Sequence, residues 1–562
     1  MEQLEYDYVV VGSGFGGSVA AMRLSQKGYR VAVIESGKRW RAQDFAPSNW
    51  NLRKFLWMPD IGLYGFHRMN VLKDVFILGG AGVGGGSINY ANTLYVPPDS
   101  FFEKESVKAL GGKEDLQPYY SLAKKMLGVT QNPHLTPQDH LLKETVAEYG
   151  RDHTFTETPV GVYFGKQGTR VPDPYFFGEG PDRTGCELCG ACMTGCRKDA
   201  KNTLDKNYLF FAEKFGAAII PENRVMDIVP LSEDGSKGYR IKTRKTTGSL
   251  GGFRGKTITA QGVVLSAGTL GTLSLLMKLK ENNRLPRLSD ALGKKVRTNS
   301  EALIGVESRN KDDDFSRGVA ITSSVFVDDN THIEPVRYAE GNDAMSLMIT
   351  LPPDEKGSLP RPLRLLKKLL ANPGDLLSIL NPVGWAKRTI ILLVMQTHDN
   401  YINIFRQRRI LWPFGKSLTS CQATDKKNPV HIPIAYDFAR RLGKRMNGIV
   451  GTTFLEAAAS IPMTAHIMGG CAFSGPDGVI DERNRVRGYQ NMLISDGSQI
   501  PENLGVNPSL SITALSERAL SFIPPKPGRT IQYLKAEKHW GLAKFLTREP
   551  QDFLKKTNDP DS

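Results

Sequence analysis

Residues 7–18 read DYVVVGSGFGGS, and this stretch decides the class of fold. Its near-continuous apolar run is ended by glycine, which is typical of a buried parallel strand. Residues 18–28 follow with apolar side chains at helical spacing, and residues 30–35 (RVAVIE) are expected to form a second strand. A strand, a glycine turn, a helix and a further strand within about 30 residues predict a βαβ unit.

The turn between this strand and helix carries the G-x-G-x-x-G pattern at Gly12, Gly14 and Gly17. The first glycine is expected to make the tight turn, the second to let the backbone approach a pyrophosphate, and the third to let the helix pack closely. Glu35 ends the second strand, where a carboxylate can accept hydrogen bonds from ribose hydroxyls. A chance glycine turn is the alternative, but the flanking strands and the acid favour a dinucleotide site.

A second glycine cluster, GGAGVGGGSINYAN at residues 79–92, separates FAD from NAD as the expected dinucleotide. Each glycine costs conformational entropy on folding, so a run of them needs a reason. A flat ring system lying against the backbone is such a reason. A flexible surface loop is the alternative, but Val83, Ile88 and Tyr90 are apolar and argue against it.

Further strand and helix patterns lie far from the first unit. Residues 262–266 and 491–496 are predicted strands, and residues 508–520 a predicted helix. The expected fold is α/β: a Rossmann-type FAD-binding domain plus an inserted α+β substrate-binding domain with an antiparallel sheet. The expected divisions are residues 1–310 with 460–530 (FAD-binding, with a Cys-rich loop at 180–200), 311–459 (substrate-binding) and 531–562 (C-terminal tail).

Composition narrows the class of partner. The chain has 562 residues and a formal net charge of +15, which favours nucleic acid or anionic lipid. The basic residues are spread along the chain and no nucleic-acid module is recognisable, so nucleic-acid binding is not expected. We find no apolar run long enough for a transmembrane helix and no secretory signal at the acidic N-terminus, so a cytoplasmic protein, peripheral to a membrane, is expected.

At this point the chain resembles the glucose–methanol–choline (GMC) oxidoreductase family over most of its length. The residues that carry the resemblance are VVVGSGFGGS with Glu35, the 79–92 cluster, VVLSAGTLGTLSLL, TAHIMGGC and SDGSQIPENLGVNPSLSITALSER. Middle segments such as THIEPVRY and VMQTHDN resemble the cholesterol-oxidase-like branch known from mycobacteria. The resemblance implies FAD, held non-covalently because no histidine is evident beside the 79–92 cluster, and hydride transfer from an alcohol carbon to flavin N5.

The resemblance also implies which residues meet the cofactor. Contacts with the ADP half are expected from the fingerprint and Glu35, and contacts with the isoalloxazine and ribityl side from the second cluster. Val225 matches the position whose backbone meets adenine. The expected FAD-binding residues are Gly12, Gly14, Phe15, Gly16, Gly17, Glu35, Gly86, Tyr90, Asn92, Val225, Asp496, Gly497 and Ser509.

His466 and Asn507 match the active-site pair of the family. An imidazole suits removal of a hydroxyl proton near neutral pH, and an amide can donate a hydrogen bond to the substrate oxygen. The alternatives are a structural histidine and an Asn-Pro turn residue. Related sterol oxidases of the actinomycete type carry proline directly after this histidine, whereas this chain has Ile467, which leaves the imidazole position open.

Oxidation of a steroid can be followed by migration of its double bond, which needs a carboxylate to move a proton. Glu334 is the acid in a suitable segment, and a salt bridge to Arg337 is the alternative role for it. The expected reaction is therefore oxidation of a sterol 3β-hydroxyl, with or without isomerisation, and reoxidation by oxygen. The alternatives are a GMC dehydrogenase that passes electrons from another lipid alcohol to a protein or quinone, and a non-enzymatic FAD- or lipid-binding protein.

Four cysteines, Cys186, Cys189, Cys192 and Cys196, have the C-x2-C-x2-C-x3-C spacing of bacterial ferredoxins. One such run supplies three ligands to its own cluster, because the fourth serves the other cluster. A structural thiol loop, an iron–sulfur cluster and disulfides all stay open, with the thiol loop favoured and no metal site assigned.

Residues 361–370, RPLRLLKKLL, have the pattern of a basic amphipathic helix at a membrane interface. Leu363, Leu366 and Leu370 share one helical face. The alternative is a helix that packs these leucines on the protein's own core and leaves its basic residues in solvent.

Overall fold

β1 (Tyr6–Val11) and β2 (Val31–Ile34) pair in parallel and are joined by α1 (Phe15–Gln26), as the opening stretch of sequence predicts. The helix begins before the expected residue 18, because Gly14 occupies its N-cap in extended backbone. The computed structural model describes residues 4–247, 255–354, 358–409 and 412–548.

The βαβ unit belongs to a sheet with the strand order β12-β2-β1-β15-β14-β13, in which β27 also pairs with β15. The pairings among β12, β2, β1, β15 and β27 are parallel, and those of β14 with β13 and β15 are antiparallel. The strands come from widely separated parts of the chain. Their bounds are β12 Ala218–Ile220, β13 Asn223–Pro230, β14 Tyr239–Lys245, β15 Thr257–Leu265 and β27 Met492–Ile494.

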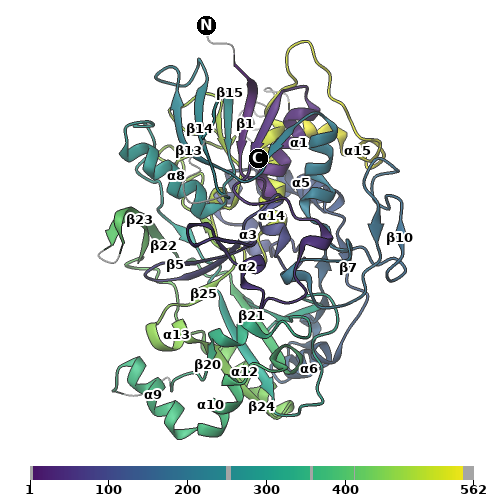
Figure 1. Cartoon of the computed structure of the whole chain (residues 1–562), viewed down its shortest axis with the longest axis vertical. Coiled ribbons are helices and arrows are strands. Elements are labelled where there is room, and N and C mark those ends of the chain that lie inside the picture. Colours follow the sequence, from purple (N-terminus) through teal and green to yellow (C-terminus); the bar gives the residue numbers. More distant parts are fainter. Residues whose placement is uncertain (1–3, 248–254, 355–357, 410–411, 549–562) are drawn as a thin grey trace, which may run out of the picture.

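Helices cover this sheet, and the two ends of the sequence meet there. Every residue of α1 is buried, and it packs on α7 (Tyr208–Lys214) and α14 (Ser509–Ser521). α14 packs in turn on α5 (Gly112–Met126). Figure 1 shows the purple start of the chain beside the yellow α14. A discontinuous nucleotide-binding half is the result, because α14 and β27 return to the βαβ unit after the long middle of the chain.

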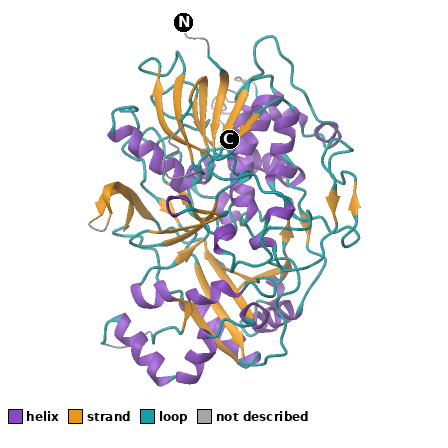
Figure 2. Cartoon of the chain, in the orientation of Figure 1, coloured by secondary structure: helices purple, strands orange, loops and turns teal. Residues whose placement is uncertain are grey.

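The other half of the molecule is built on an antiparallel sheet in the order β20-β24-β17-β21-β19-β18-β8 (Figures 1 and 2). β17 and β8 precede residue 311 in the chain, so this sheet draws on more of the sequence than the expected range 311–459. The bounds are β8 Thr156–Glu157, β17 Ala302–Ser308, β18 Ser323–Phe326, β19 Thr331–Val336, β20 Ile349–Thr350, β21 Thr389–Gln396 and β24 Gly448–Thr453.

Alternation along these strands separates two faces. On β21, Ile390 and Leu392 join a core beneath α12 (Pro433–Arg445), whereas Ile391 and Leu393 line a cavity on the opposite face. On β17, Leu303 likewise points to the cavity side. Because successive side chains of a strand point to opposite faces, one face of this sheet packs in the core and the other forms a wall of the cavity.

Short strands join the two halves. β25 (Met463–Thr464) pairs with β6 (Phe76–Gly80), and β26 (Met468–Gly469) pairs with β16 (Val296–Arg297). β16 also pairs with β22 of the hairpin β22–β23, which projects at the left of Figure 1. The bounds of the hairpin strands are Ile402–Arg409 and Trp412–Gln422.

The predicted amphipathic segment forms α9 (Arg361–Ala371), followed by α10 (Pro373–Leu380) at the lower end of Figure 1. None of the described helices combines the length and the hydropathy that a membrane-spanning helix requires. In the expected C-terminal tail, α15 (Lys535–His539) is tied to α1 by an ion pair between Arg23 and Glu537. Residues 549–562 of that tail lie outside the described part.

Candidate active site

A cavity of about 340 Å³ lies between the two halves. At one end its wall is glycine-rich backbone from the nucleotide-binding half, and at the other it is apolar side chains from the antiparallel sheet and from Asp343–Met348. We call the second end the apolar chamber. Its members are Leu303, Ile321, Val336, Met345, Met348, Ile349, Trp385, Ile391 and Leu393.

Four glycines, Gly14, Gly79, Gly86 and Gly268, form the first end, which we call the glycine cradle. A Cβ placed on any of them would meet nothing within 4 Å. Each therefore exposes bare backbone to the cavity, as a pyrophosphate at a helix N-terminus and a flat flavin ring require. The cradle fits FAD, and of the expected contacts Phe15, Gly16, Tyr90, Gly497 and Ser509 also line the cavity.

The remaining fingerprint glycines serve packing. Gly12 has φ +99°, and a Cβ there would lie 2.2 Å from Ser266 O. A Cβ on Gly17 would lie 2.1 Å from Gly12 O. The first and third glycines thus allow the tight turn and the close helix contact predicted for them, and neither lines the cavity.

Glu35 is buried behind the cradle. Its Oε2 accepts hydrogen bonds from Ser13 N (3.1 Å) and Ser13 Oγ (2.7 Å), and its Oε1 accepts one from Gly37 N (2.9 Å). Oε1 also lies 3.3 Å from Gly82 N of the second glycine cluster. The carboxylate therefore links the two glycine segments, and a carboxylate has further lone pairs for a ribose hydroxyl.

Asn92 and Val225 are buried outside the cavity wall. Asn92 adopts φ +70°, and its amide lies beside the Cys192 thiol of the cysteine loop. Asp496 does line the cavity; it accepts hydrogen bonds from Ser498 N (2.9 Å) and Thr272 Oγ1 (2.5 Å). Burial raises the pKa of the Asp496 carboxyl, since the charged form is poorly solvated there.

His466 lies between β25 and β26 and faces the cavity where the cradle meets the apolar chamber. Its Nδ1 is 2.9 Å from Glu301 Oε2, a close contact that is not aligned as a hydrogen bond in this conformation. Ile467, at the position where related enzymes carry proline, also lines the cavity, and its carbonyl accepts a hydrogen bond from Thr269 Oγ1 (2.8 Å). The backbone after the histidine is therefore held by a hydrogen bond.

Asn507 lies across the same cavity, just before α14. Its Nδ2 donates to Glu334 Oε2 at 3.1 Å, while its Oδ1 has no partner among the described residues. Because an amide nitrogen has two protons, one remains for a ligand. The structure thus brings together two of the expected catalytic residues that are 173 positions apart in the chain.

Glu334 is fully buried, and burial raises the pKa of its carboxyl to about 8. The alternative role, a salt bridge to Arg337, is wrong. Arg337 donates instead to Thr136 Oγ1 (2.9 Å) and Thr322 Oγ1 (2.7 Å). Residues three apart on an extended chain point to opposite faces, which separates the two side chains.

Two residues of the cavity wall were not anticipated from the sequence. Glu301 ends the buried stretch between β16 and β17 and contacts His466; its segment, LPRLSDALGKKVRTNSE, resembles the cholesterol-oxidase-like branch, but no role was expected for Glu301 itself. His67 lies on β5 (His67–Val71), opposite Gly80 of β6, and its Nδ1 is 3.0 Å from Asn89 Nδ2. A histidine therefore does lie beside the 79–92 cluster, because a hairpin brings it there. Burial lowers the pKa of His67 to about 4.

The cysteine loop adjoins the cavity through Met193, which is part of its wall. Cys186, Cys192 and Cys196 pack against Val160, Val162, Ala200 and Val319, and all four thiols of the loop are free. Within the described residues no group of three or more His, Cys, Asp or Glu side chains is arranged to hold a metal ion.

Buried Lys201 joins this loop to the second glycine cluster. Its Nζ donates to the carbonyls of Ile88 (2.9 Å), Tyr90 (2.8 Å) and Cys192 (2.8 Å). The cysteine loop is therefore connected to the second glycine cluster by hydrogen bonds.

Sequence profiles of known families match three parts of the chain. Residues 10–69 match an NAD(P)-binding Rossmann-like domain, and residues 180–285 and 424–516 match the two GMC oxidoreductase domains. The chain is 48% identical over 531 residues to a cholesterol oxidase of Acinetobacter baumannii, an alignment that covers 93% of this chain and 95% of that protein. The chain belongs to the GMC oxidoreductase family. It is an FAD-dependent oxidoreductase that acts on CH–OH groups.

Two further relatives and a solved structure are also similar to this chain over most of its length. A cholesterol oxidase of Mycobacterium tuberculosis is 48% identical over 541 residues, covering 93% of this chain and 92% of that protein. A long-chain-alcohol oxidase of Arabidopsis thaliana is 25% identical over 554 residues, covering 91% and 66%. Among solved structures, pyridoxine 4-oxidase from Mesorbium loti has a TM-score of 0.59 at 16% identity and covers 91% of this chain and 97% of that one, which shows a common fold.

Proposed function

We propose that this GMC enzyme oxidises the 3β-hydroxyl of a sterol and returns the electrons to oxygen. The observation that carries the proposal is a continuous cavity in which the glycine cradle passes into the apolar chamber, with His466 and Asn507 at their junction. A sterol is a rigid apolar body with one hydroxyl at its end, and an apolar pocket with few polar groups suits such a ligand. The cholesterol oxidases at 48% identity support the same substrate class.

Each residue at the junction has a role in this proposal. His466 removes the hydroxyl proton, and Asn507 donates its free N–H to the substrate oxygen, which orients the carbinol. FAD bound in the cradle supplies the hydride acceptor. The apolar chamber excludes water and would hold the carbinol carbon next to the hydride acceptor of the bound flavin; reacting atoms in such aligned pairs are about 3–3.5 Å apart.

The isomerisation step is proposed for Glu334. Its Oε1 has no hydrogen-bond partner in the described structure and lies 3.9 Å from His332 Nδ1. With a pKa raised to about 8 by burial, the carboxyl can both accept and release a proton near neutral pH. That is the behaviour required to move a proton between two carbons of a steroid ring.

A peripheral membrane contact is proposed at α9 and α10. The alternative packing, with leucines on the core, is wrong for most of the helix. Leu366 and Leu370 are 52% and 74% exposed, and Leu377 on α10 is 70% exposed, while Leu365 alone on α9 is buried. The opposite side of the pair packs Leu369 and Ile379 with Ile349, a residue of the apolar chamber. An outward apolar face thus lies over the apolar end of the cavity, which suits a substrate dissolved in lipid.

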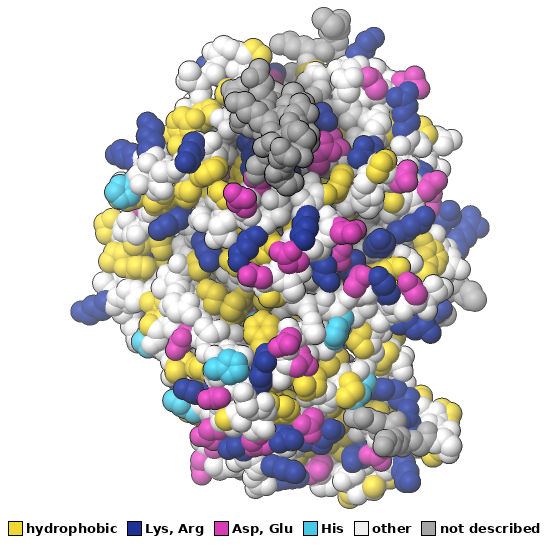
Figure 3. Space-filling model, turned by 180° about the vertical axis from the view of Figure 1, so that it is seen from behind, with side chains coloured by type: hydrophobic (Ala, Val, Ile, Leu, Met, Phe, Trp, Pro, Cys, Tyr) yellow, Lys and Arg dark blue, Asp and Glu magenta, His cyan; other side chains and the backbone are white. Residues whose placement is uncertain are grey.

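Three of the four basic side chains of α9 contact the protein itself, and the fourth, Lys367, is exposed. Arg364 donates to Asp354 O at 2.5 Å, Lys368 is 3.4 Å from Asp354 Oδ1, and Arg361 is 3.7 Å from Glu456 Oε1. On the face of the molecule drawn in Figure 3, Lys and Arg side chains are scattered among Asp and Glu. We therefore expect the leucines to contribute more to membrane contact than the charges do.

The test of the oxidation is anaerobic flavin bleaching with a panel of alcohols. Sterols with a 3β-hydroxyl are expected to bleach the flavin, their 3α epimers to be poor substrates, and admission of oxygen to restore the colour with formation of hydrogen peroxide. Bleaching by long-chain alcohols but not by sterols would overturn the substrate class. Bleaching without reoxidation by oxygen would favour the dehydrogenase alternative.

The test of the membrane contact is co-sedimentation with phosphatidylcholine–phosphatidylserine vesicles. The Leu366→Ser/Leu370→Ser variant is expected to sediment much less than wild type. The matched control is Leu135→Ser, at an exposed leucine outside α9 and α10. Equal sedimentation of all three proteins would show that this face does not dock.

A further inference from the structure

Residues 298–301 (Thr-Asn-Ser-Glu) connect β16 to β17 and pass between the two segments that carry the active-site pair. All four residues are buried. Asn299 and Ser300 adopt φ +61° and +47°, a left-handed conformation that is uncommon outside glycine. Two such residues in succession persist only where surrounding contacts hold them, and such positions cluster at functional sites. We call this stretch the 298–301 segment.

One end of the segment holds the backbone that carries His466. Glu301 Oε1 accepts a hydrogen bond from Ala465 N (3.1 Å), and Glu301 Oε2 accepts one from Thr464 Oγ1 (2.8 Å). Thr464 Oγ1 is also 3.0 Å from Thr298 O. The same Oε2 lies 2.9 Å from His466 Nδ1, so the carboxylate contacts both the ring and the residues before it.

The other end holds the loop that leads into Asn507. Asn299 Oδ1 accepts hydrogen bonds from Leu504 N (3.0 Å) and Gly505 N (2.8 Å), and Asn299 Nδ2 donates to Val506 O (2.9 Å). One amide side chain thus contacts three successive residues before Asn507. The backbone N–H of Asn299 adds a fourth contact by donating to Asn503 Oδ1 at 2.9 Å.

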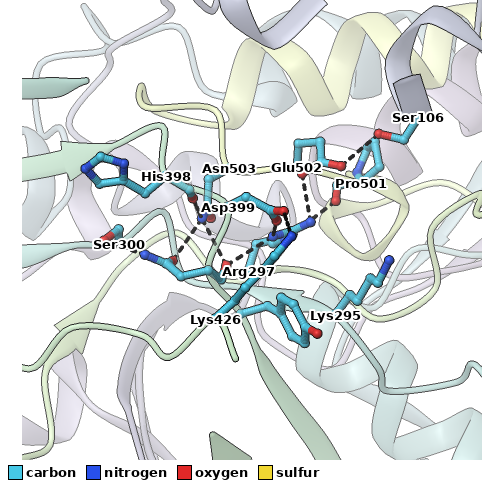
Figure 4. A network of polar contacts seen from close by, with 12 residues as sticks. Ser106, Lys295, Arg297, Ser300, His398, Asp399, Lys426, Pro501, Glu502 and Asn503 are labelled. Atoms are coloured by element: carbon cyan, nitrogen blue, oxygen red, sulfur yellow. Dashed lines mark hydrogen bonds and ion pairs between the residues drawn. The ribbon is translucent and has the colours of Figure 1, made fainter. Parts of the chain in front are cut away.

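Arg297, directly before the segment, anchors the start of the same loop (Figure 4). Its Nε donates to Pro501 O (3.1 Å) and its Nη2 to Glu502 Oε2 (2.7 Å), while Asp399 pairs with its Nη1. Asn503 donates from the loop to His398 O at 2.7 Å. The loop from 501 to 506 is therefore held along its length from one side.

We infer that Glu301 and Asn299 are the positioning residues of the active site, with Glu301 orienting His466 and Asn299 placing Asn507. The inference rests on the proposed function for its catalytic meaning. A carboxylate beside Nδ1 favours the tautomer that carries its proton on Nδ1, which leaves Nε2 unprotonated to act as the base. Because both residues belong to one short buried segment, that segment sets the separation of the catalytic pair, and a displacement of about 1 Å can cost ~10²-fold in rate.

Glu301 is tested with Glu301→Gln, Glu301→Asp and a matched control, Glu307→Gln. Glu307 is a buried carboxylate on β17, the strand that directly follows Glu301, and it pairs with Arg388 (2.8 Å) away from the cavity wall. In anaerobic single turnover, Glu301→Gln is expected to lower the limiting rate of flavin reduction at least about 10-fold, with FAD content and substrate affinity within about threefold of wild type. Glu301→Asp keeps the charge and should recover part of the rate.

The limiting rate of flavin reduction in Glu307→Gln should stay within about threefold of the wild-type rate in the same assay. A limiting rate in Glu301→Gln that matches this control would overturn the role of Glu301. So would equal rates in Glu301→Gln and Glu301→Asp, because the retained charge would then have no effect. If Glu301→Gln does not fold, the limiting rate of flavin reduction in Glu301→Asp decides the role of Glu301. A merely structural carboxylate would give a folded Glu301→Asp protein with the wild-type rate, whereas a positioning carboxylate gives a lower one.

Asn299 is tested by separating its backbone conformation from its hydrogen bonds. Asn299→Gly accepts the left-handed φ but has no side chain, whereas Asn299→Asp keeps the acceptor for Leu504 N and Gly505 N. The expected order of limiting rates is wild type, then Asp, then Gly, with Gly at least about 10-fold below wild type. Equal activity of Asn299→Gly and wild type would show that only the backbone conformation matters.

A readout without substrate separates this inference from the proposed function. In ¹⁵N-histidine-labelled holoenzyme, the signal lost in His466→Gln identifies His466. In wild type it should report a protonated Nδ1 and an unprotonated Nε2, and in Glu301→Gln a mixture of tautomers. The same tautomer ratio in both proteins would overturn the inference even if sterols prove to be substrates. A changed ratio with no sterol turnover would overturn only the substrate proposal.

Discussion

The glycine cradle and its junction with the apolar chamber are built in different ways. The glycine cradle is backbone from residues grouped in short stretches. Its glycines have no side chains, so the backbone itself faces the cavity and leaves room for a cofactor. The junction where the cradle meets the apolar chamber is lined by side chains from separate segments, namely His466, Glu301 and Asn507, and Asn507 donates in turn to Glu334. Substitutions in the cradle should therefore act by occupying space, and substitutions at the junction by removing charge or orientation.

The largest expected effect is a difference in stability between alanine substitutions at two glycines of the nucleotide-binding half. Gly17→Ala puts a Cβ 2.1 Å from Gly12 O, so α1 must move and the fold should lose at least about 1–3 kcal/mol with most of its bound FAD. Gly86→Ala faces open space, so the apoprotein should keep its stability while FAD affinity falls. Thermal unfolding and flavin-to-protein absorbance ratios check both, and an unstable Gly86→Ala apoprotein would contradict the assignment of Gly86 to the cradle.

At the junction, His466→Gln should lower the limiting rate of flavin reduction by about 10²-fold or more, the usual size of a lost acid–base group. FAD content should be unchanged, because His466 meets the cavity where the cradle ends. Stopped-flow bleaching checks the rate. A decrease of only a few-fold would mean that another group removes the proton.

Glu334→Gln should have a smaller effect on oxidation and a distinct effect on the pH dependence of stability. Burial raises the pKa of Glu334 to about 8, so the folded protein binds this proton more tightly than the unfolded chain does. Its contribution to the free energy of unfolding is therefore fully present below the unfolded pKa, near 4.3, and is lost as pH rises through about 8.

Denaturant unfolding between pH 5 and 9 checks this sign. Wild type should lose stability relative to Glu334→Gln as the pH rises, by a few kcal/mol at most. A constant difference across the range would mean that Glu334 ionises as an exposed carboxyl does. In the same variant, formation of a conjugated ketone product should disappear if the proposed isomerisation depends on this carboxylate.

The smallest effect is expected at the cysteine loop. Cys189→Ser should leave flavin reduction within about twofold of wild type and should alter thermal stability or the use of an electron acceptor instead. Iron and acid-labile sulfide assays on anaerobically prepared protein accompany the kinetics. Stoichiometric iron and sulfide would assign the loop an electron-transfer role in place of a structural one.

The nucleotide-binding half could be predicted from the sequence because its rules are local. A strand, a glycine turn and a helix are specified by neighbouring residues, and the spacing of Gly12, Gly14 and Gly17 follows from the backbone geometry of one turn. The antiparallel sheet was predicted as a class, but its membership was not. β17 and β8 belong to this sheet although they lie outside the expected range 311–459, since strand pairing depends on contacts between residues that are distant in sequence.

The sequence by itself therefore determined the βαβ unit, the glycine-rich cofactor segments and, through family motifs, the residue types His466 and Asn507. Tertiary structure alone decided that Glu301 meets His466, that Glu334 pairs with Asn507 instead of Arg337, and that the leucine face of α9 points outward. The physical reason is that a hydrogen bond or a buried face depends on which surfaces meet in space. A periodic pattern specifies that α9 has two faces, but only packing against α13 (Phe454–Ala459) and α10 selects the one that is covered.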